Sequence, residues 1–162
     1  MLPKPYLDSS TIVKRYVVEP GTRIVDEIFD RAEAGELHII FSLWNVGEVI
    51  GVLDERVRRG WISEGDFNLA LRKFAGELTN LLRLGFLEIV PTSTSVLIDG
   101  WRLIVNLHIY EADALQISTC THSGCDSLLT GDRRLVAAAR KMQVRAHDVV
   151  REEGQIKELI RS

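Results

Sequence analysis

Four carboxylates occupy positions where an acid is either well placed for chemistry or costly to bury. Asp8 and Asp132 each follow a short apolar run that we expect to be a strand. Glu48 and Asp113 lie on expected helices, each flanked by apolar residues one turn before and one turn after. A charged group in an apolar stripe is costly unless it is paired or bound to a metal ion. Together the four acids favour a site for a hard divalent cation, Mg²⁺ or Mn²⁺.

Each acid also has a purely structural interpretation. Asp8 and Asp132 could cap the helices that begin after them, which is the commonest role of Asp at such a place. Glu48 could pair with a nearby Arg or Lys, and Asp113 could be a buried acid bonded to backbone or hydroxyl groups. Converging carboxylates repel, so without a cation at least one pKa in the group should rise.

Short apolar runs alternate with helical periodicity along the chain. The predicted strands are 6–8, 37–41, 86–90, 127–130 and 144–146. The predicted helices are 11–17, 22–34, 42–59, 61–85, 95–107, 111–121 and 133–141, with a frayed helix from about residue 150. Strands separated by helices imply parallel, right-handed connections. We therefore predict an α/β fold, a three-layer α/β/α sandwich, whose functional crevice lies beyond the carboxyl ends of the strands.

Composition indicates one domain, residues 1–162. Apolar residues make up 46% of the 162, enough for a substantial core. The net charge of −3 argues against a protein that coats nucleic acid by charge alone, but leaves room for an enzyme with a local basic rim. No run of eighteen apolar residues occurs, so we expect a cytoplasmic protein without a membrane partner.

The two cysteines, Cys120 and Cys125, fit neither a CxxC zinc site nor a secreted disulfide framework. A zinc site that includes His122 lacks a fourth ligand at a usual spacing. Two ordinary thiols are the preferred interpretation. The histidines are scattered along the chain and form no recognisable nuclease arrangement, which leaves the carboxylates as the candidate chemistry.

Four segments, in this order, resemble the PIN-domain family of nucleases, and within it the VapC-type toxins of prokaryotic toxin–antitoxin pairs. The segments are Tyr-Leu-Asp8-Ser-Ser, Ser42-Leu-Trp-Asn-Val-Gly-Glu48-Val, Glu-Ala-Asp113-Ala-Leu and Leu-Leu-Thr-Gly-Asp132-Arg-Arg-Leu. The similarity extends over nearly the whole chain and keeps the order of all four acids. Each segment is weak evidence alone, but the ordered set on an α/β frame is specific.

The resemblance implies a parallel sheet of about five strands in the order 3-2-1-4-5 and a metal-dependent endoribonuclease with one or two Mg²⁺ or Mn²⁺ ions. It also implies an RNA substrate, an antitoxin partner and a homodimer. Asp8, Glu48, Asp113 and Asp132 match the family's acidic quartet, and Ser9 and Thr130 match its supporting hydroxyl residues.

We expect Asp8 and Asp132 to bind the metal directly, with Glu48 and Asp113 as ligands or as partners of metal-bound water. Basic side chains close to these acids could hold RNA phosphates. The candidates are Lys14, Arg15, Arg133, Arg134 and Arg140. Their structural alternative is an ordinary solvated helix face.

Two other functions remain open. The first is a non-catalytic PIN-fold module that binds RNA or protein. The second is a phosphoryl-transfer enzyme of the haloacid-dehalogenase or receiver type, which also has an Asp after the first strand. The second is disfavoured because Ser10 stands where a DxD pair needs its second acid, and no Lys clearly follows a later strand.

Overall fold

The protein is built around one five-stranded parallel sheet. The structure is a computed structural model, which describes residues 2–161. The strand order is β3-β2-β1-β4-β5, as predicted. The strands are β1 (Pro5–Leu7), β2 (Ile39–Ser42), β3 (Leu87–Val90), β4 (Ser127–Thr130) and β5 (Ala146–Asp148). The helices are α1 (Ser9–Val13), α2 (Thr22–Glu33), α3 (Leu43–Arg58), α4 (Glu64–Leu84), α5 (Thr94–Leu107), α6 (Glu111–Ser123), α7 (Arg133–Lys141) and α8 (Glu153–Leu159). None of the helices within the described range is both long enough and apolar enough to cross a bilayer.

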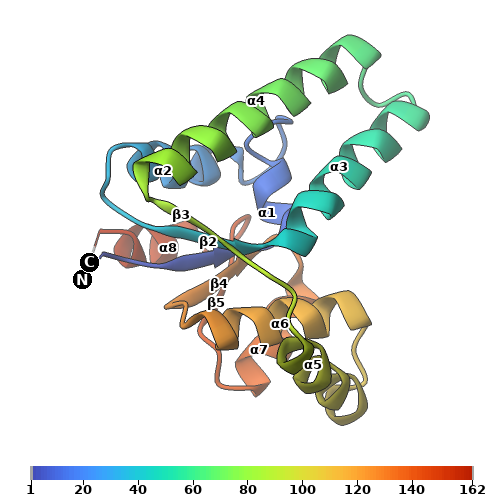
Figure 1. The fold of residues 1–162 in the computed structure, drawn as a ribbon, viewed down its shortest axis with the longest axis vertical. Helices are drawn as coiled ribbons and strands as arrows, with labels where there is room; N and C mark the ends of the chain where they lie inside the picture. The colour runs from blue at the N-terminus through green and yellow to red at the C-terminus, as the bar shows by residue number, and fades with distance from the viewer. Residues whose placement is uncertain (1, 162) are drawn as a thin grey trace.

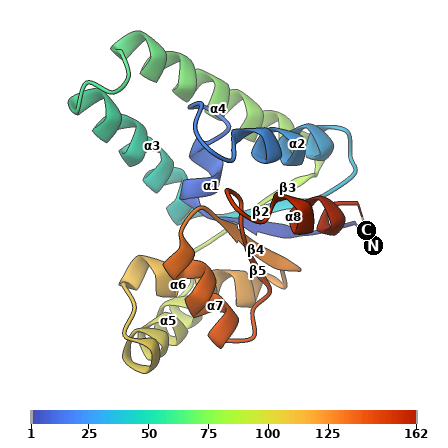
Figure 2. The same ribbon diagram turned by 180° about the vertical axis from the view of Figure 1, so that it is seen from behind.

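Helices cover both faces of the sheet, which confirms the three-layer architecture. Helices α1 to α4 and α8 lie on one side, and α5, α6 and α7 lie on the other (Figures 1 and 2). Successive strand residues face opposite layers. Leu7 packs into the first core, and its neighbour Tyr6 packs into the second. The central strands are therefore apolar on both faces and wholly buried, which explains why they appear in the sequence as short continuous apolar runs.

Four of the five strands differ from their predicted ranges, the first and third by one residue and the second and fifth by up to two. The second strand was predicted at 37–41 but pairs with β3 from Ile39 to Ser42. The fifth was predicted at 144–146 but begins at Ala146. Val144 donates its backbone N–H to Ala139, and Gln143 has a φ of 60°, so both residues belong to the turn that ends α7. Val144 therefore belongs to the turn after α7, and β5 begins two residues later.

The C-terminal segment is anchored, so the prediction of a frayed helix from about residue 150 is wrong. Helix α8 covers the α2 side of the sheet, and Ile156, Leu159 and Ile160 are buried in the first core. Their spacing of three and four residues gives α8 one apolar face. That face covers core residues that β5 and α2 alone would leave open to water.

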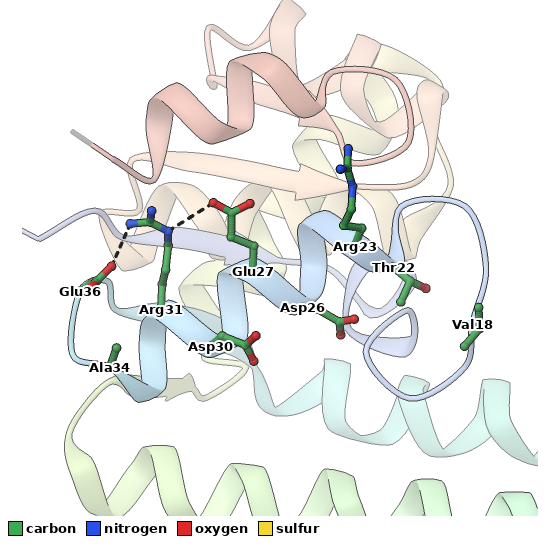
Figure 3. A pocket seen from close by; sticks show the side chains of 9 residues that line it. All are labelled: Val18, Thr22, Arg23, Asp26, Glu27, Asp30, Arg31, Ala34 and Glu36. Atoms are coloured by element: carbon green, nitrogen blue, oxygen red, sulfur yellow. Dashed lines mark hydrogen bonds and ion pairs between the residues drawn. The ribbon is translucent and has the colours of Figure 1, made fainter.

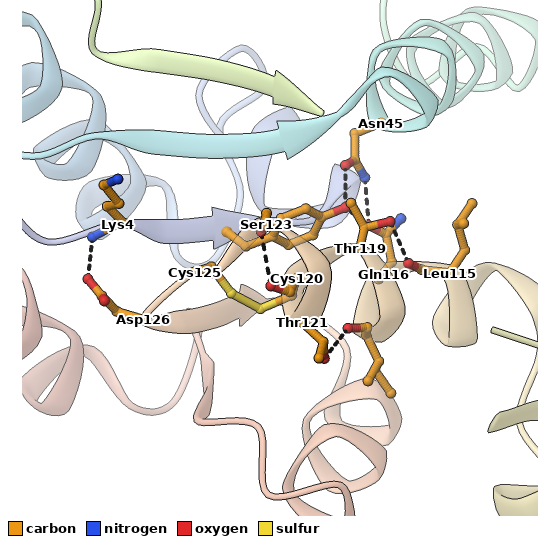
Figure 4. The surroundings of a disulfide bond; sticks show 12 residues. Lys4, Asn45, Leu115, Gln116, Thr119, Cys120, Thr121, Ser123, Cys125 and Asp126 are labelled. Carbon is orange, nitrogen blue, oxygen red and sulfur yellow. Dashed lines mark hydrogen bonds between the residues drawn. A yellow bond between two sulfur atoms is a disulfide. The ribbon is translucent and has the colours of Figure 1, made fainter. Parts of the chain in front are cut away.

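Cys120 and Cys125 form a disulfide bond, so the prediction of two ordinary thiols is wrong (Figure 4). Gly124 ends α6 with a φ of 66° and turns the chain back toward the helix. The turn brings the two Cα atoms to 5.6 Å, an ordinary disulfide separation. His122 contacts Asp99 at 2.8 Å instead of joining the cysteines in a zinc site.

Strand β5 lies at an edge of the sheet, and side chains occupy its outward backbone groups. The Arg140 guanidinium donates to the Ala146 carbonyl at 2.8 and 3.1 Å. The Glu152 carboxylate accepts from the Asp148 backbone N–H at 3.0 Å and also from Arg140. The Arg140 and Glu152 side chains thus take the place of a sixth strand.

The anchoring of α8 predicts a large stability loss on truncation of Ile156. This side chain is fully buried, and Ile156→Ala should lower the free energy of unfolding by about 2–5 kcal/mol. Urea denaturation monitored by circular dichroism measures the loss. A change below about 0.5 kcal/mol, comparable with an exposed substitution, would show that α8 is only loosely attached.

Candidate functional site

The four predicted acids lie toward the carboxyl end of the sheet. Asp8 directly follows β1 and caps α1, and Asp132 follows β4 and caps α7. Glu48 lies in the second turn of α3, which starts where β2 ends, and Asp113 lies in the first turn of α6. Asp8, Asp132 and Asp113 thus lie at helix N-termini, where backbone N–H groups and the helix dipole favour anions. The structural interpretation of Asp8 and Asp132 as caps holds, and it is compatible with a metal-binding role.

Strand pairing fixes the relation of the two strand-end acids. β1 and β4 are adjacent and parallel, with Leu7 opposite Leu129, so Asp8 falls beside Thr130. The Thr130 hydroxyl donates to Asp8 Oδ2 at 2.7 Å and accepts from the backbone N–H of Asp132 at 2.9 Å. One hydroxyl group thus connects the two acids at the point where the strand order reverses.

The Asp8 carboxylate is buried and surrounded by donors. Oδ1 accepts from the Thr11 backbone N–H at 2.9 Å, and the Ser10 hydroxyl lies 2.8 and 2.9 Å from the two oxygens. Burial raises the pKa of Asp8 from 3.8 to about 6, against the opposing effect of these hydrogen bonds. The anion is therefore held in a defined geometry at an energetic cost.

The hydroxyl beside Asp8 belongs to Ser10, whereas the family resemblance pointed to Ser9. Besides Asp8, Ser10 Oγ accepts from the Gly131 backbone N–H at 2.8 Å, so it links α1 to the loop after β4. Ser9 makes no comparable contact with Asp8 within residues 2–161. Ser10 was missed because Ser9 and Ser10 both directly follow the capping Asp8, and either hydroxyl is a plausible partner from the sequence. Only the direction of the first helical turn decides which one reaches the carboxylate.

Repulsion between the acids affects the pKa of Asp113. Its pKa is raised, first by burial and then by the nearby negative charges of Asp132 and Glu48. The Arg134 side chain opposes this rise only in part. The direction at Asp113 is the one expected for converging carboxylates, whereas the pKa of Asp8 is raised by burial.

Glu48 is half-buried and has two amide partners. The Gln116 Nε2 atom donates to Glu48 Oε2 at 2.9 Å, and Asn45 Nδ2 lies 3.5 Å from the same oxygen. Neither Gln116 nor Asn45 was among the predicted site residues. Gln116 lies three residues after Asp113 and so shares its side of α6. A search for buried polar residues on the stripes of the acids would have found it.

The donor set fits a hard divalent cation, which prefers several oxygen ligands and retains waters. All four groups are carboxylates, and two of them have pKa values raised by burial and, at Asp113, by mutual repulsion. Within residues 2–161, no three acidic, His or Cys side chains approach closely enough to surround an ion on their own. An ion held by these carboxylates would therefore need water molecules to complete its ligand shell.

The basic candidates separate into two groups. Lys14 is buried and paired with Glu19 at 2.7 Å, and Arg15 forms ion pairs with Glu77, Asp26 and Asp30. Their charges are thus compensated inside the protein, and Arg140 is likewise used at the β5 edge. Arg133 and Arg134 are exposed at the start of α7, directly after Asp132. These two remain the basic side chains best placed beside the acids.

A broad open groove of about 740 Å³ runs along α2, away from this group of acids. Figure 3 shows its lining, in which Arg31 reaches both Glu27 and Glu36. None of the four carboxylates lines it. Its other charged residues pair outside the groove, Asp26 and Asp30 with Arg15 and Arg23 with Glu153, so we assign it no part in the site.

Comparison with known families identifies one domain. The family model for the PIN domain matches residues 6–141, most of the chain. No curated protein sequence matches the chain significantly.

Several solved structures share the fold. PAE2754 from Pyrobaculum aerophilum superposes with a TM-score of 0.67 at 19% identity over 100% of both chains. FitAcB from Neisseria gonorrhoeae gives 0.65 at 17% identity over 90% of this chain and 97% of the other. VapC20 from Mycobacterium tuberculosis, described as a sarcin–ricin loop cleaving toxin, gives 0.60 at 13% identity over 83% and 94%. At these identities the likeness establishes the fold.

The raised pKa of Asp8 predicts how stability depends on pH without divalent ions. The folded state favours the protonated acid, so this contribution is fully present below pH 3.8 and is lost as the pH rises through about 6. The loss is about 3 kcal/mol, from a difference of 2.2 in pKa. In EDTA, wild type should therefore lose more stability between pH 4 and 7.5 than Asp8→Asn does. Urea titrations of both proteins measure this, and equal losses would contradict the assignment.

Proposed function

The chain belongs to the PIN-domain family, and on that premise we propose that it is a metal-dependent endoribonuclease that acts as the toxin of a toxin–antitoxin pair. The observation that carries the proposal is the gathering of four carboxylates at one end of the sheet, with raised pKa values at Asp8 and Asp113. Such an arrangement is costly for folding alone. It is useful where a bound cation and a phosphate group meet.

Each acid has a distinct role in the proposed mechanism. Asp8 and Asp132 would hold Mg²⁺ or Mn²⁺ directly, with Thr130 maintaining the spacing between them. When bound, one or two such ions lower the pKa of a coordinated water and neutralise charge on the scissile phosphate. Glu48 and Asp113 face the same region from α3 and α6. They would complete the ligand set or orient the attacking water.

RNA is the proposed substrate for two reasons. A structural neighbour is described as a toxin that cleaves the sarcin–ricin loop. In addition, Arg133 and Arg134 project from the helix that Asp132 caps, where guanidinium groups can bind backbone phosphates. RNA in the cytoplasm would be the target.

An antitoxin is the proposed protein partner. Among the neighbours that share the fold are a toxin–antitoxin complex from Klebsiella pneumoniae and VapBC2 from Rickettsia felis, bound to a fragment of its promoter DNA. A small antitoxin encoded beside this chain would, by this proposal, suppress its nuclease activity.

A second candidate function is a non-catalytic PIN-fold module that binds RNA or protein. It is favoured by one observation, the lack of three closely converging ligands among residues 2–161. The two candidates differ in the response to metal, because only the nuclease needs the four carboxylates for turnover.

Substitution of the acids should abolish cleavage. Asp8→Asn and Glu48→Gln should each lower the rate of Mn²⁺-dependent RNA cleavage by about 100-fold or more. Loss of a residue that only hydrogen-bonds to a metal ligand costs about 10- to 100-fold, and loss of a ligand itself should cost at least as much. Cleavage of an RNA panel, with mapping of 5′-phosphate and 3′-hydroxyl ends, measures this.

Asp54→Asn is a matched control for Glu48→Gln, because Asp54 is an exposed acid on the same helix, paired with Arg58. It should cleave at the wild-type rate. If all variants cleave equally, or if wild type cleaves no RNA with Mg²⁺ or Mn²⁺, the nuclease proposal fails and the binding module is favoured.

The proposed homodimer would use an exposed apolar surface on α3 and α5. Trp44, Leu97 and Trp101 line one apolar pocket of about 370 Å³ there. Leu43, Ile50, Ile98 and Val105 are also exposed on these two helices. Gly47 and Gly51 lie between the apolar residues of α3, and open space surrounds the position of a Cβ at each. A second copy could bring its backbone close at these glycines.

Placing a charge in this surface should produce monomers. Trp101 is 60% exposed, and Trp101→Glu should shift the protein from dimer to monomer in light scattering after size exclusion. Trp61→Glu is the control, since Trp61 is 66% exposed at the turn between α3 and α4. Dissociation by the control alone, or a monomeric wild type at micromolar concentration, would contradict this surface.

A further inference from the structure

A chain of buried hydrogen bonds begins at the N-terminus of α3. The Ser42 backbone N–H and hydroxyl donate to Asn45 Oδ1 at 2.8 and 2.7 Å. A backbone N–H can only donate, so the atom it meets must be the amide oxygen. This fixes the orientation of the Asn45 amide and directs its Nδ2 away from the cap. The capping box of α3 therefore decides which way a buried donor points.

The fixed donor sets the orientation of a second amide. Asn45 Nδ2 donates to Gln116 Oε1 at 2.9 Å (Figure 4). The Tyr6 hydroxyl lies 2.6 Å from the same oxygen and 2.8 Å from Asn45 Oδ1. Burial raises the pKa of Tyr6 well above its usual range, so the hydroxyl keeps its proton. Because Oε1 accepts from Asn45 Nδ2, Gln116 Nε2 must face the other way, and there it donates to Glu48 Oε2 at 2.9 Å.

Burial leaves this arrangement little freedom. Gln116 is 3% exposed, and Asn45 and Tyr6 are completely buried. Turning the Gln116 amide over would place Oε1 against the Glu48 carboxylate and would leave the Asn45 donor without an acceptor. Unsatisfied buried groups of this kind are costly, so the amide holds one orientation.

The same contact selects between the two oxygens of Glu48. Within residues 2–161, the hydrogen bonds to this carboxylate reach Oε2 only. Oε1 is left without a donor, on a half-buried side chain whose charge acts on Asp113. One oxygen is thus fixed by protein, and the other is available to a cation or its water.

We infer that Gln116 is a positioning residue, which orients the Glu48 carboxylate so that Oε1 faces the metal and Oε2 is held by the protein. The inference rests on the proposed function, because it requires Glu48 to serve a bound divalent ion. It assigns a role to a residue on α6 that lies outside the acidic quartet. It also connects the α3 cap to the metal site through Asn45 and Tyr6.

The first test is Gln116→Met, which keeps the length of the side chain and removes both amide groups. Titration calorimetry with Mn²⁺ alone should show affinity lower by about 10- to 100-fold than in wild type. Ser118→Ala is the matched control. It removes another buried hydrogen bond of α6, from Ser118 Oγ to the Val96 carbonyl, without touching Glu48. The control should lose thermal stability in EDTA but keep wild-type affinity for Mn²⁺.

A double variant separates positioning from general damage. In a Glu48→Gln background, the Gln116→Met change should cause no further loss of Mn²⁺ affinity, since its effect passes through Glu48. A further tenfold loss there would overturn the inference. So would wild-type affinity in Gln116→Met alone, with the proposed function left intact.

Asn45→Asp keeps the inference testable if Gln116→Met does not fold. One oxygen of the new carboxylate still accepts from the Ser42 N–H. The other oxygen replaces Asn45 Nδ2, so Gln116 Oε1 meets an acceptor where it had a donor. The Gln116 amide should turn over and repel Glu48, which again lowers Mn²⁺ affinity about tenfold or more. Unchanged affinity would overturn the inference. A wild type that neither binds Mn²⁺ nor cleaves RNA would overturn both this inference and the proposed function.

Discussion

The structure depends on keeping a carboxylate, Asp8, buried between two parallel strands. Its oxygens take hydrogen bonds from Thr130, Ser10 and the Thr11 backbone, and burial still raises its pKa to about 6. The β1–β4 pairing and the start of α1 contribute groups to this one anion, and the loop after β4 holds Ser10 through the Gly131 N–H. A protein with no use for the charge would be more stable with a neutral residue here. Under the proposed function, a bound cation would offset part of this cost and the repulsion between the surrounding acids.

Polar contacts of the site cross the layers of the fold. Tyr6 belongs to β1, Asn45 to α3 and Gln116 to α6, so the network joins the central strand to helices from both sides of the sheet. The Ser42 backbone N–H fixes the orientation of Asn45, and Asn45 in turn fixes that of Gln116. The geometry at Glu48 is consequently a property of the assembled core, whereas Asp132 and Arg134 are exposed at the start of α7.

Much of this architecture could be predicted from the sequence because its signals are local. Short apolar runs gave the strands, and Asp8 and Asp132 could be recognised at their ends. What could not be predicted depends on contacts between distant segments. The choice of Ser10 over Ser9 follows from the turn of α1 toward Gly131, and the role of Gln116 needs Asn45, 71 residues away. The docking of α8 and the Cys120–Cys125 bond likewise appear only when the chain is folded.

The side chains that cover β5 have a consequence for how the protein behaves in a crowded solution. An exposed parallel edge offers N–H and C=O groups to any extended chain, and this is how sheets grow into aggregates. Arg140 and Glu152 occupy the Ala146 carbonyl and the Asp148 N–H, and they place two charges in the path of an incoming strand. Loss of either would expose a template for intermolecular pairing. At this edge, protection against intermolecular strand pairing thus depends on the Arg140–Glu152 ion pair.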